Sequence, residues 1–418
     1  MQKLRGLCRT LVLLTSVSTL AQTPVPTTWE QVRHRFEQDN PTLIAGKLNI
    51  DESKAQEITA YLRPNPGASL TADQFNPFNG GPPHSCCGTL LTVAAFSYLH
   101  EREHKRELRL ESAQKDTAIA VSTQADLERS LLFGLRSAFV STLQAKAVLR
   151  LAKDNLAYYD RVLDISSKRF KAGDIAQIDL DRLELQRVQY ESDLQTAEVN
   201  LRTAKIALLT LLNDRTPIEK FDVTGPFDFS EQLLSQDEFR KIALDNRPDL
   251  RAAVQAVDKA QTDHKLAVAN GSTDPTFGVD AGRNPPIDQY VGFNVSIPLR
   301  IFDRNQGEKL RTQLDITRNE RLRDAAEALV FSDVDSGYAT LASTVILLRP
   351  YKAKYLQQSV RVRDTIFFSY QHGGASLLDF LNAESDYRAV QLNYVNLVGS
   401  YLTAAAQLNL AAGREVIQ

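Results

Sequence analysis

The sequence predicts a mainly α-helical fold with a small β part, built from two copies of one unit. Three observations indicate this fold: a composition typical of long helices, an internal repeat at an offset of about 200 residues, and short strands at the same place in each copy. Of the 418 residues, 43% are apolar and 24% are charged, which is typical of a folded chain. The formal net charge of -2 gives no electrostatic case for nucleic acid as a partner.

Residues 1–21 have the pattern of a secretory signal peptide. A basic start with Lys3, Arg5 and Arg9 precedes a short apolar run, which ends in small residues up to Ala21. A transmembrane helix is the alternative, but polar residues interrupt the run and it is short. Removal of this segment takes the net charge from -2 to -5. Because no later stretch has about 18 uninterrupted apolar residues, we expect an exported chain that is soluble, peripheral or a β-barrel.

The internal repeat is an ordered series of matches between the two halves. An offset of 200 residues aligns several pairs: Asp179 with Asp379, Glu184 with Glu384, Ala204 with Ala404, and Leu208 with Leu408. Earlier in each half, Asn40-Pro41 matches Arg247-Pro248. We therefore expect a first unit over residues 22–220, a linker over 221–234, a second unit over 235–412 and a C-terminal tail over 413–418.

Each copy is expected to open with one helix, over 28–62 and over 235–269. Both begin with a capping-box pattern, Thr28-Trp29-Glu30-Gln31 in the first copy and Ser235-Gln236-Asp237-Glu238 in the second. A break rich in proline and glycine follows each helix and ends it.

Two short strands follow the break in each copy. The clearest lies over 291–299, where apolar side chains alternate with small or polar ones and give the strand one apolar face. Its partner alternates in the same way over 276–281. In the first copy the alternation of Leu91, Val93 and Ala95 with their neighbours is weaker.

A very long helix comes next, over about 101–171 in one copy and about 303–371 in the other, and at about 1.5 Å per residue each is roughly 100 Å long. A glycine turn ends each helix, and a returning helix follows over 175–213 and over 376–412. Helices this long without a globular core of their own predict antiparallel coiled coils. Pro350 should kink or break the second long helix.

The number of strands calls for an assembly. Four strands cannot close a barrel, and a lipid bilayer does not tolerate an open sheet edge. If the strands cross an outer membrane, two, three or four copies must pool them, and a wide lumen favours the larger counts. The alternative is a periplasmic coiled-coil scaffold without a pore, but that protein would have no core to bury the apolar face over 291–299.

Together these features resemble the TolC-like outer-membrane efflux factors, in particular the branch that contains the outer-membrane parts of heavy-metal efflux pumps. The resemblance covers essentially the whole mature chain. Its carriers are the two-fold repeat, the Asn40-Pro41 and Arg247-Pro248 pairs, the stretch over 295–308 and the Lys171-Ala172-Gly173 turn. The first copy departs from the family pattern over 98–107, where a charged run replaces Asp-Arg-Asn-x-Gly.

The resemblance implies a homotrimer in the outer membrane that extends into the periplasm. Twelve strands would form a barrel in the outer-membrane lipid, and twelve helices would form a tunnel. The chain would then be the passive exit duct of a tripartite efflux or type I secretion system. Its partners would be a periplasmic adaptor (membrane-fusion) protein and an inner-membrane pump, with no cofactor and no enzymatic activity.

The resemblance also places the two glycine turns at the periplasmic tip, where such channels close and meet the adaptor. The candidates for gate or adaptor contacts there are Lys171, Gly173, Asp174, Asp179, His372, Gly373, Gly374 and Asp379. Glycine permits positive φ, and rings of carboxylates around a threefold axis attract cations. Helix capping is the alternative role for Asp179 and Asp379, since both lie near helix starts.

Two short patterns suggest metal chemistry. His100-Glu101-Arg102-Glu103-His104 matches the H-E-x-x-H zinc-protease pattern, in which a helix presents both histidines and Glu101 acts as a general base. Its many charges and the lack of a third ligand favour a surface helix start instead. His84, Cys86 and Cys87 lie in the first expected hairpin loop and could bind a soft metal, although a variable surface loop is the simpler interpretation.

Overall fold

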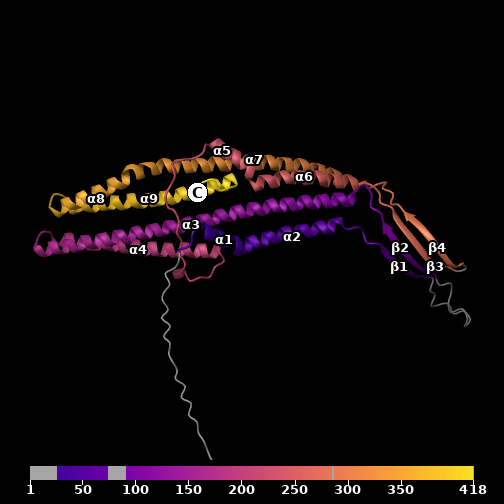
Figure 1. Ribbon diagram of the computed structural model, residues 1–418, viewed down its shortest axis with the longest axis horizontal. Helices are drawn as coiled ribbons and strands as arrows, with labels where there is room; N and C mark the ends of the chain where they lie inside the picture. Colours follow the sequence, from indigo (N-terminus) through magenta and orange to yellow (C-terminus); the bar gives the residue numbers. More distant parts are fainter. Residues whose placement is uncertain (1–25, 74–90, 285–286, 418) are drawn as a thin grey trace, which may run out of the picture.

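The computed structural model describes residues 26–73, 91–284 and 287–417. The predicted signal peptide over 1–21 and the first expected hairpin loop, over 76–88, lie outside these residues. Figure 1 shows an elongated molecule with the four strands at one end and two helical turns at the other. The turns and the sheet therefore lie at opposite ends of the long axis of the molecule.

The two halves of the chain contain the same order of elements, which confirms the predicted repeat. The first half consists of α1 (Trp29–Asp39), α2 (Pro41–Tyr61), β1 (Gly67–Asp73), β2 (Leu91–Leu99), α3 (Lys105–Ala172) and α4 (Gln177–Leu211). The second half consists of α5 (Gln236–Asn246), α6 (Pro248–Ala269), β3 (Thr276–Asn284), β4 (Ile287–Ser296), α7 (Gln306–Pro350), the π-helical turn η2 (Tyr351–Tyr355), α8 (Leu356–Gln371) and α9 (Leu377–Ala412). A short 3₁₀ turn, η1 (Ile218–Lys220), lies between the halves.

The prediction of one opening helix in each copy is wrong, because both are divided in two. Asn40 adopts an extended backbone with ψ 117°, and its side chain accepts hydrogen bonds from the amides of Thr42 and Leu43. A residue before proline is disfavoured in the helical region, and proline is well suited to the first position of a new helix. Arg247, with ψ 120°, precedes Pro248 and divides α5 from α6 in the same way.

The prediction that Pro350 interrupts the second long helix is confirmed. Proline cannot donate the amide hydrogen bond that the helix interior requires. The chain passes from Pro350 into η2, whose end is marked by a hydrogen bond from the Leu356 amide to the Tyr351 carbonyl. Figure 1 shows a step in the helix between α7 and α8, whereas α3 runs without interruption.

The two junctions between strand and long helix share a left-handed residue just before the helix despite different sequences. His104 precedes α3 with φ 55°, and Asn305 precedes α7 with φ 61°. The charged run of the first copy differs in having a second left-handed residue, Glu103 with φ 56°. Just inside α3, Lys105 is buried and its Nζ lies 2.6 Å from a carboxylate oxygen of Asp274, which joins the two copies.

The four strands form one antiparallel sheet in the order β1-β2-β3-β4. Phe96 pairs with Val279, and Val279 pairs with Phe293, so one apolar face runs across the sheet. Ala95 pairs with Asp280. The weak alternation predicted in the first copy is therefore out of phase: Ala95 lies on the polar face, because β2 has apolar residues on both faces.

The helices form a curved layer whose order follows that of the strands. On the sheet side, α2 packs on α3, α3 on α6, and α6 on α7. Toward the turns, α4 packs on α3, α3 on α9, and α9 on α8. Each strand continues the helix that leads into it or out of it, so neighbours in the helical layer stay neighbours in the sheet.

The linker over 221–234 is part of the core. Phe221, Val223 and Phe229 are buried, and Val223 forms a parallel bridge with Thr27. These contacts hold the linker against the middle of the long helices. Among the described residues, no helix is both long and apolar enough to cross a lipid bilayer.

Candidate functional site

The two turns at the tip have matching backbone geometry. Gly173 has φ 86° and Gly373 has φ 75°, values that favour glycine. The amide of Asp174 donates to the Arg169 carbonyl at 2.9 Å, and 200 positions later Gly374 donates to the Ser369 carbonyl at 2.8 Å. The sequence repeat therefore reproduces the turns down to single hydrogen bonds.

The charged candidates at the tip differ in what they contact. Lys171 and Asp174 are exposed, and neither forms a salt bridge within the described ranges. Asp379 accepts hydrogen bonds from the Ser376 amide at 3.0 Å and the Ser376 hydroxyl at 2.7 Å. These bonds lower the pKa of Asp379 and cap α9. Asp179 is half-buried at the start of α4, where Ala176 occupies the N-cap position and offers no side-chain cap.

His372 is held against its own helix. Its Nδ1 lies 2.8 Å from the Phe368 carbonyl oxygen, and its ring packs on the Phe368 ring with centroids 4.2 Å apart. The imidazole nevertheless lies at the exposed surface of the turn.

A group of buried aromatic and aliphatic side chains lies behind the turns, and sequence analysis did not identify it. We call it the tip cluster: Tyr159, Val162, Leu183, Tyr190, Tyr370, Leu377 and Phe380. Tyr159 of α3 stacks on Tyr190 of α4 with centroids 4.3 Å apart, and Tyr370 of α8 stacks on Phe380 of α9 at 5.5 Å. The cluster draws on all four helices of the tip, so it joins the two coils.

Polar contacts reinforce the tip cluster across the two coils. Arg169 of α3 donates to the Tyr370 carbonyl at 3.2 Å, and its guanidinium lies 5.2 Å from the centre of the Tyr370 ring. Farther along the returning helices, Arg388 of α9 pairs with Asp193 of α4. Its guanidinium lies 4.3 Å from the centre of the Tyr190 ring. These contacts all link the first copy to the second.

Glu384 is a buried acid in the same seam. Its exposed fraction is 1%, and one of its oxygens accepts a hydrogen bond of 3.4 Å from the Tyr190 hydroxyl. The other oxygen has no partner among the described residues. Burial raises the pKa of Glu384, although Arg363 and Arg388 lie close enough to oppose that effect. A protonated carboxyl at this place can both donate and accept across the seam.

The H-E-x-x-H pattern does not form the site that its spacing suggests. Residues 101–104 precede α3, so no helix presents His100 and His104 on one face. Glu101 pairs with Arg109, and His100 packs edge-on against Phe277. Within the described ranges, no three His, Cys, Asp or Glu side chains are arranged to hold a metal ion. His84, Cys86 and Cys87 lie outside those ranges.

Comparisons with known proteins match this architecture along most of the chain. The family model described as outer membrane efflux protein matches residues 240–414. The cobalt-zinc-cadmium resistance protein CzcC of Cupriavidus metallidurans is 23% identical over 397 residues, which are 93% of this chain and 90% of that protein. Outer membrane protein TolC of Escherichia coli is 21% identical over 408 residues, 92% of this chain and 81% of that protein.

Solved structures share the fold. A structure of CusC superimposes with a TM-score of 0.77 at 17% identity and covers 94% of this chain and 93% of that chain. The outer membrane protein VceC of Vibrio cholerae superimposes with a TM-score of 0.76 at 15% identity and covers 93% of this chain and 96% of that chain.

Proposed function

The chain belongs to the outer membrane efflux proteins of the TolC family, and we propose that three copies of it form one continuous exit duct. As a member of that family it is an outer membrane exit channel for tripartite efflux. Three copies pool twelve strands into a barrel in the outer membrane and twelve helical segments into a tunnel across the periplasm. The duct is passive, since an inner-membrane pump supplies the energy and a periplasmic adaptor connects the two.

One observation carries this proposal: the apolar face of the sheet is turned outward and left uncovered. Val291 is 85% exposed and Phe293 is 70% exposed, and on β1 Leu70 is 82% exposed. Soluble proteins bury such faces, whereas a barrel in lipid turns them toward the acyl chains. The sheet is open at β1 and β4, so neighbouring copies must complete it.

The helical layer supports the same assembly. Its edges are α2 and α4 on one side and α7 and α8 on the other, and α2 and α7 lead to the open edges of the sheet at β1 and β4. Large apolar side chains are exposed along these edges: Leu48 and Ile58 on α2, Leu185 and Val199 on α4, and Leu310, Leu314 and Leu322 on α7. Packing the α2/α4 edge of one copy against the α7/α8 edge of the next buries these side chains and closes the ring.

A pair of substitutions on β4 tests this arrangement. Phe293→Lys places a charge on the face proposed to contact lipid, which costs about 2–4 kcal/mol at the bilayer midplane. Asn294→Lys is the matched control, because Asn294 is exposed on the opposite face. We expect Phe293→Lys to lose heat-resistant trimers from the outer-membrane fraction and to lose conductance in planar bilayers, while Asn294→Lys retains both. A periplasmic scaffold without a pore would tolerate both changes equally.

At the tip we propose a different role for each of the candidate residues. The exposed pair Lys171 and Asp174 lies free on the first turn and is available to the adaptor. The contacts of Arg169 and Arg388 hold the two coils together and so keep the tunnel narrow at rest. Asp379 mainly caps α9, but its carboxylate is exposed and adds negative charge near the threefold axis of the trimer.

The conductance of single trimers tests these roles. Arg388→Ala should widen the resting tip and raise conductance several-fold, because it removes both the ion pair with Asp193 and the contact with Tyr190. Asp174→Ala should leave conductance nearly unchanged and weaken adaptor binding. Unchanged conductance in Arg388→Ala would mean that the contacts between the coils do not keep the tunnel narrow. Unchanged adaptor affinity in Asp174→Ala would mean that Asp174 does not contact the adaptor.

A further inference from the structure

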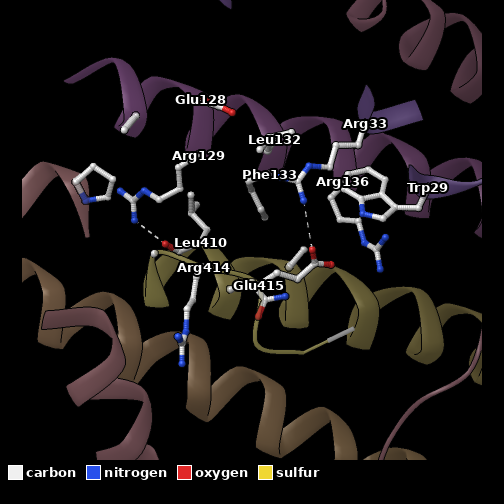
Figure 2. Close-up of a pocket in the computed structure, with 15 residues that line it drawn as sticks. Trp29, Arg33, Glu128, Arg129, Leu132, Phe133, Arg136, Leu410, Arg414 and Glu415 are labelled. Carbon is white, nitrogen blue, oxygen red and sulfur yellow. Dashed lines mark hydrogen bonds and ion pairs between the residues drawn. The ribbon is translucent and has the colours of Figure 1, made fainter. Parts of the chain in front are cut away.

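A cavity of 420 Å³ lies at mid-length in the molecule, far from both the tip and the sheet. Helix α1, the middle of α3, the end of α9 and the C-terminal tail surround it (Figure 2). Its volume falls in the range of pockets that bind small molecules, about 300–1,000 Å³. The exit duct that we propose does not use this cavity.

The walls of the cavity are largely apolar. Trp29 of α1, Leu132 and Phe133 of α3, and Leu410 of α9 line it, and Pro248 at the start of α6 completes one side. Apolar and aromatic walls of this kind accept the hydrocarbon part of a ligand.

Two of the arginines in the wall are held by ion pairs. Arg129 pairs with Asp126 and donates to the Leu410 carbonyl. Arg33 lies 2.7 Å from a carboxylate oxygen of Glu37 and 3.7 Å from one of Glu415. Figure 2 shows the contact of Arg129 with Leu410 and the contact of Arg33 with Glu415. It also shows Arg414 pointing away from the other labelled side chains.

Arg136 differs from Arg33 and Arg129. Its guanidinium lies over the Trp29 ring, 4.5 Å from the centroid, and it makes no hydrogen bond or ion pair with any described residue. Burial lowers the pKa of Arg136, and the charges of Glu415 and Glu30 partly oppose that effect. Arg136 is therefore a half-buried cation whose hydrogen-bond donors have no partner among the described residues.

A cation in this setting favours a ligand with one negative charge. The guanidinium fork matches a carboxylate in a bidentate geometry, and one unpaired cation balances one charge. Two acids line the wall: Glu415 pairs with Arg33, and Glu128 lies eight residues from Arg136 on α3, about 12 Å along the helix axis. A doubly charged anion would leave one charge uncompensated among apolar walls.

We infer that this cavity is a binding site for a small amphipathic monocarboxylate, with the carboxylate on Arg136 and the apolar part along Trp29, Leu132 and Phe133. The inference rests on the cavity and its unpaired cation, and it stands whether or not the chain forms a duct.

Trp29 makes the test direct, because it is the only tryptophan in the chain. The full-length protein in a non-ionic detergent is titrated with 4-phenylbutanoate, by calorimetry and by tryptophan fluorescence, and in parallel with the uncharged 4-phenylbutanamide. We expect saturable binding of the acid, a change in Trp29 emission, and at least tenfold weaker binding of the amide. Arg136→Gln should weaken acid binding roughly tenfold to a hundredfold, and Arg136→Lys should weaken it less.

The controls separate a site from general effects of charge. Arg150→Gln changes an exposed arginine on the same helix outside the cavity, and it should bind like the wild type. Ala125→Phe fills the cavity without altering its charge, and it should abolish binding even if Arg136→Gln fails to fold. The inference is overturned if the wild type shows no saturable binding, if acid and amide bind equally, or if either Arg136→Gln or Ala125→Phe binds the acid like the wild type.

Discussion

The two coils at the tip are related by the repeat, yet positions 200 residues apart meet different surroundings. Glu184 on α4 is exposed, whereas Glu384 on α9 is buried against the other coil. Arg150 lies in the middle of the unbroken α3, whereas Pro350 ends α7 and starts a π-helical turn. The second coil thus contains the interruption of the long helix, and it also presents the buried acid to the seam between the coils. An internal repeat supplies matching elements, but it does not give them matching contacts.

The largest expected difference between the coils lies in their buried side chains. Phe380 is fully buried and contacts both Phe367 and Tyr370 in the tip cluster, while its repeat partner Leu180 lies outside that cluster. Phe380→Ala should lower the free energy of unfolding by about 3–5 kcal/mol, and Leu180→Ala by about 2–3 kcal/mol. Thermal dissociation of the trimer measures both. Equal losses would mean that the cluster does not join the coils as its stacking suggests.

The next difference between the two coils is the pH dependence of the stability that each acid contributes. Burial raises the pKa of Glu384 above its ordinary value of 4.5, so the folded state binds its proton more tightly than the unfolded state. The fold therefore loses stability as pH rises from 4.5 through the raised pKa, by about 1.4 kcal/mol for each unit of the shift. Glu384→Gln should raise the dissociation temperature at neutral pH and leave it unchanged at pH 4.

Glu184→Gln provides the matched comparison, since Glu184 is exposed on the related helix. It should have no measurable effect at either pH. A Glu384→Gln variant with the same pH profile as the wild type would show that Glu384 ionises freely in the fold.

The smallest expected difference concerns the starts of the returning helices. Ser376 caps α9 through a reciprocal pair of contacts with Asp379, whereas Ala176 gives α4 no side-chain cap. Ser376→Ala should cost about 1 kcal/mol, and Ala176→Ser should gain a similar or smaller amount. Hydrogen exchange in the first turn of each returning helix measures the change. If both substitutions have the same sign, the two helix starts are not the contrasting pair that the structure indicates.

Local patterns in the sequence were sufficient for much of the fold. The glycine turns, the returning helices and the interruption at Pro350 all depend on short-range backbone chemistry, and the structure confirms them. The division of the opening helices depends on equally local chemistry at Asn40 and Arg247, but the sequence analysis took the Asn40-Pro41 and Arg247-Pro248 pairs as repeat matches and not as helix boundaries. The phase of β2 was wrong because its apolar residues lie on both faces and only pairing with β3 selects one.

The candidate site was less predictable because its contacts join residues far apart in sequence. Glu184 and Glu384 occupy the same place in the repeat, so no local pattern distinguishes the exposed acid from the buried one. The pairing of Asp193 with Arg388 and the position of Arg136 over Trp29 depend on how the helices cross. One signal of the tip cluster was available in the sequence. Each of the helices α3, α4 and α8 has a tyrosine within about 14 residues of a turn, at Tyr159, Tyr190 and Tyr370.

The C-terminal tail ends at the waist of the molecule, beside α9 and near α1 (Figure 1). Asn409 fastens it there, since its side chain bonds both to the Val416 amide and to the Ile417 carbonyl. A fluorophore or affinity label attached after this anchored stretch would sit midway between the sheet and the helical turns. Such a label would lie far from both ends of the molecule.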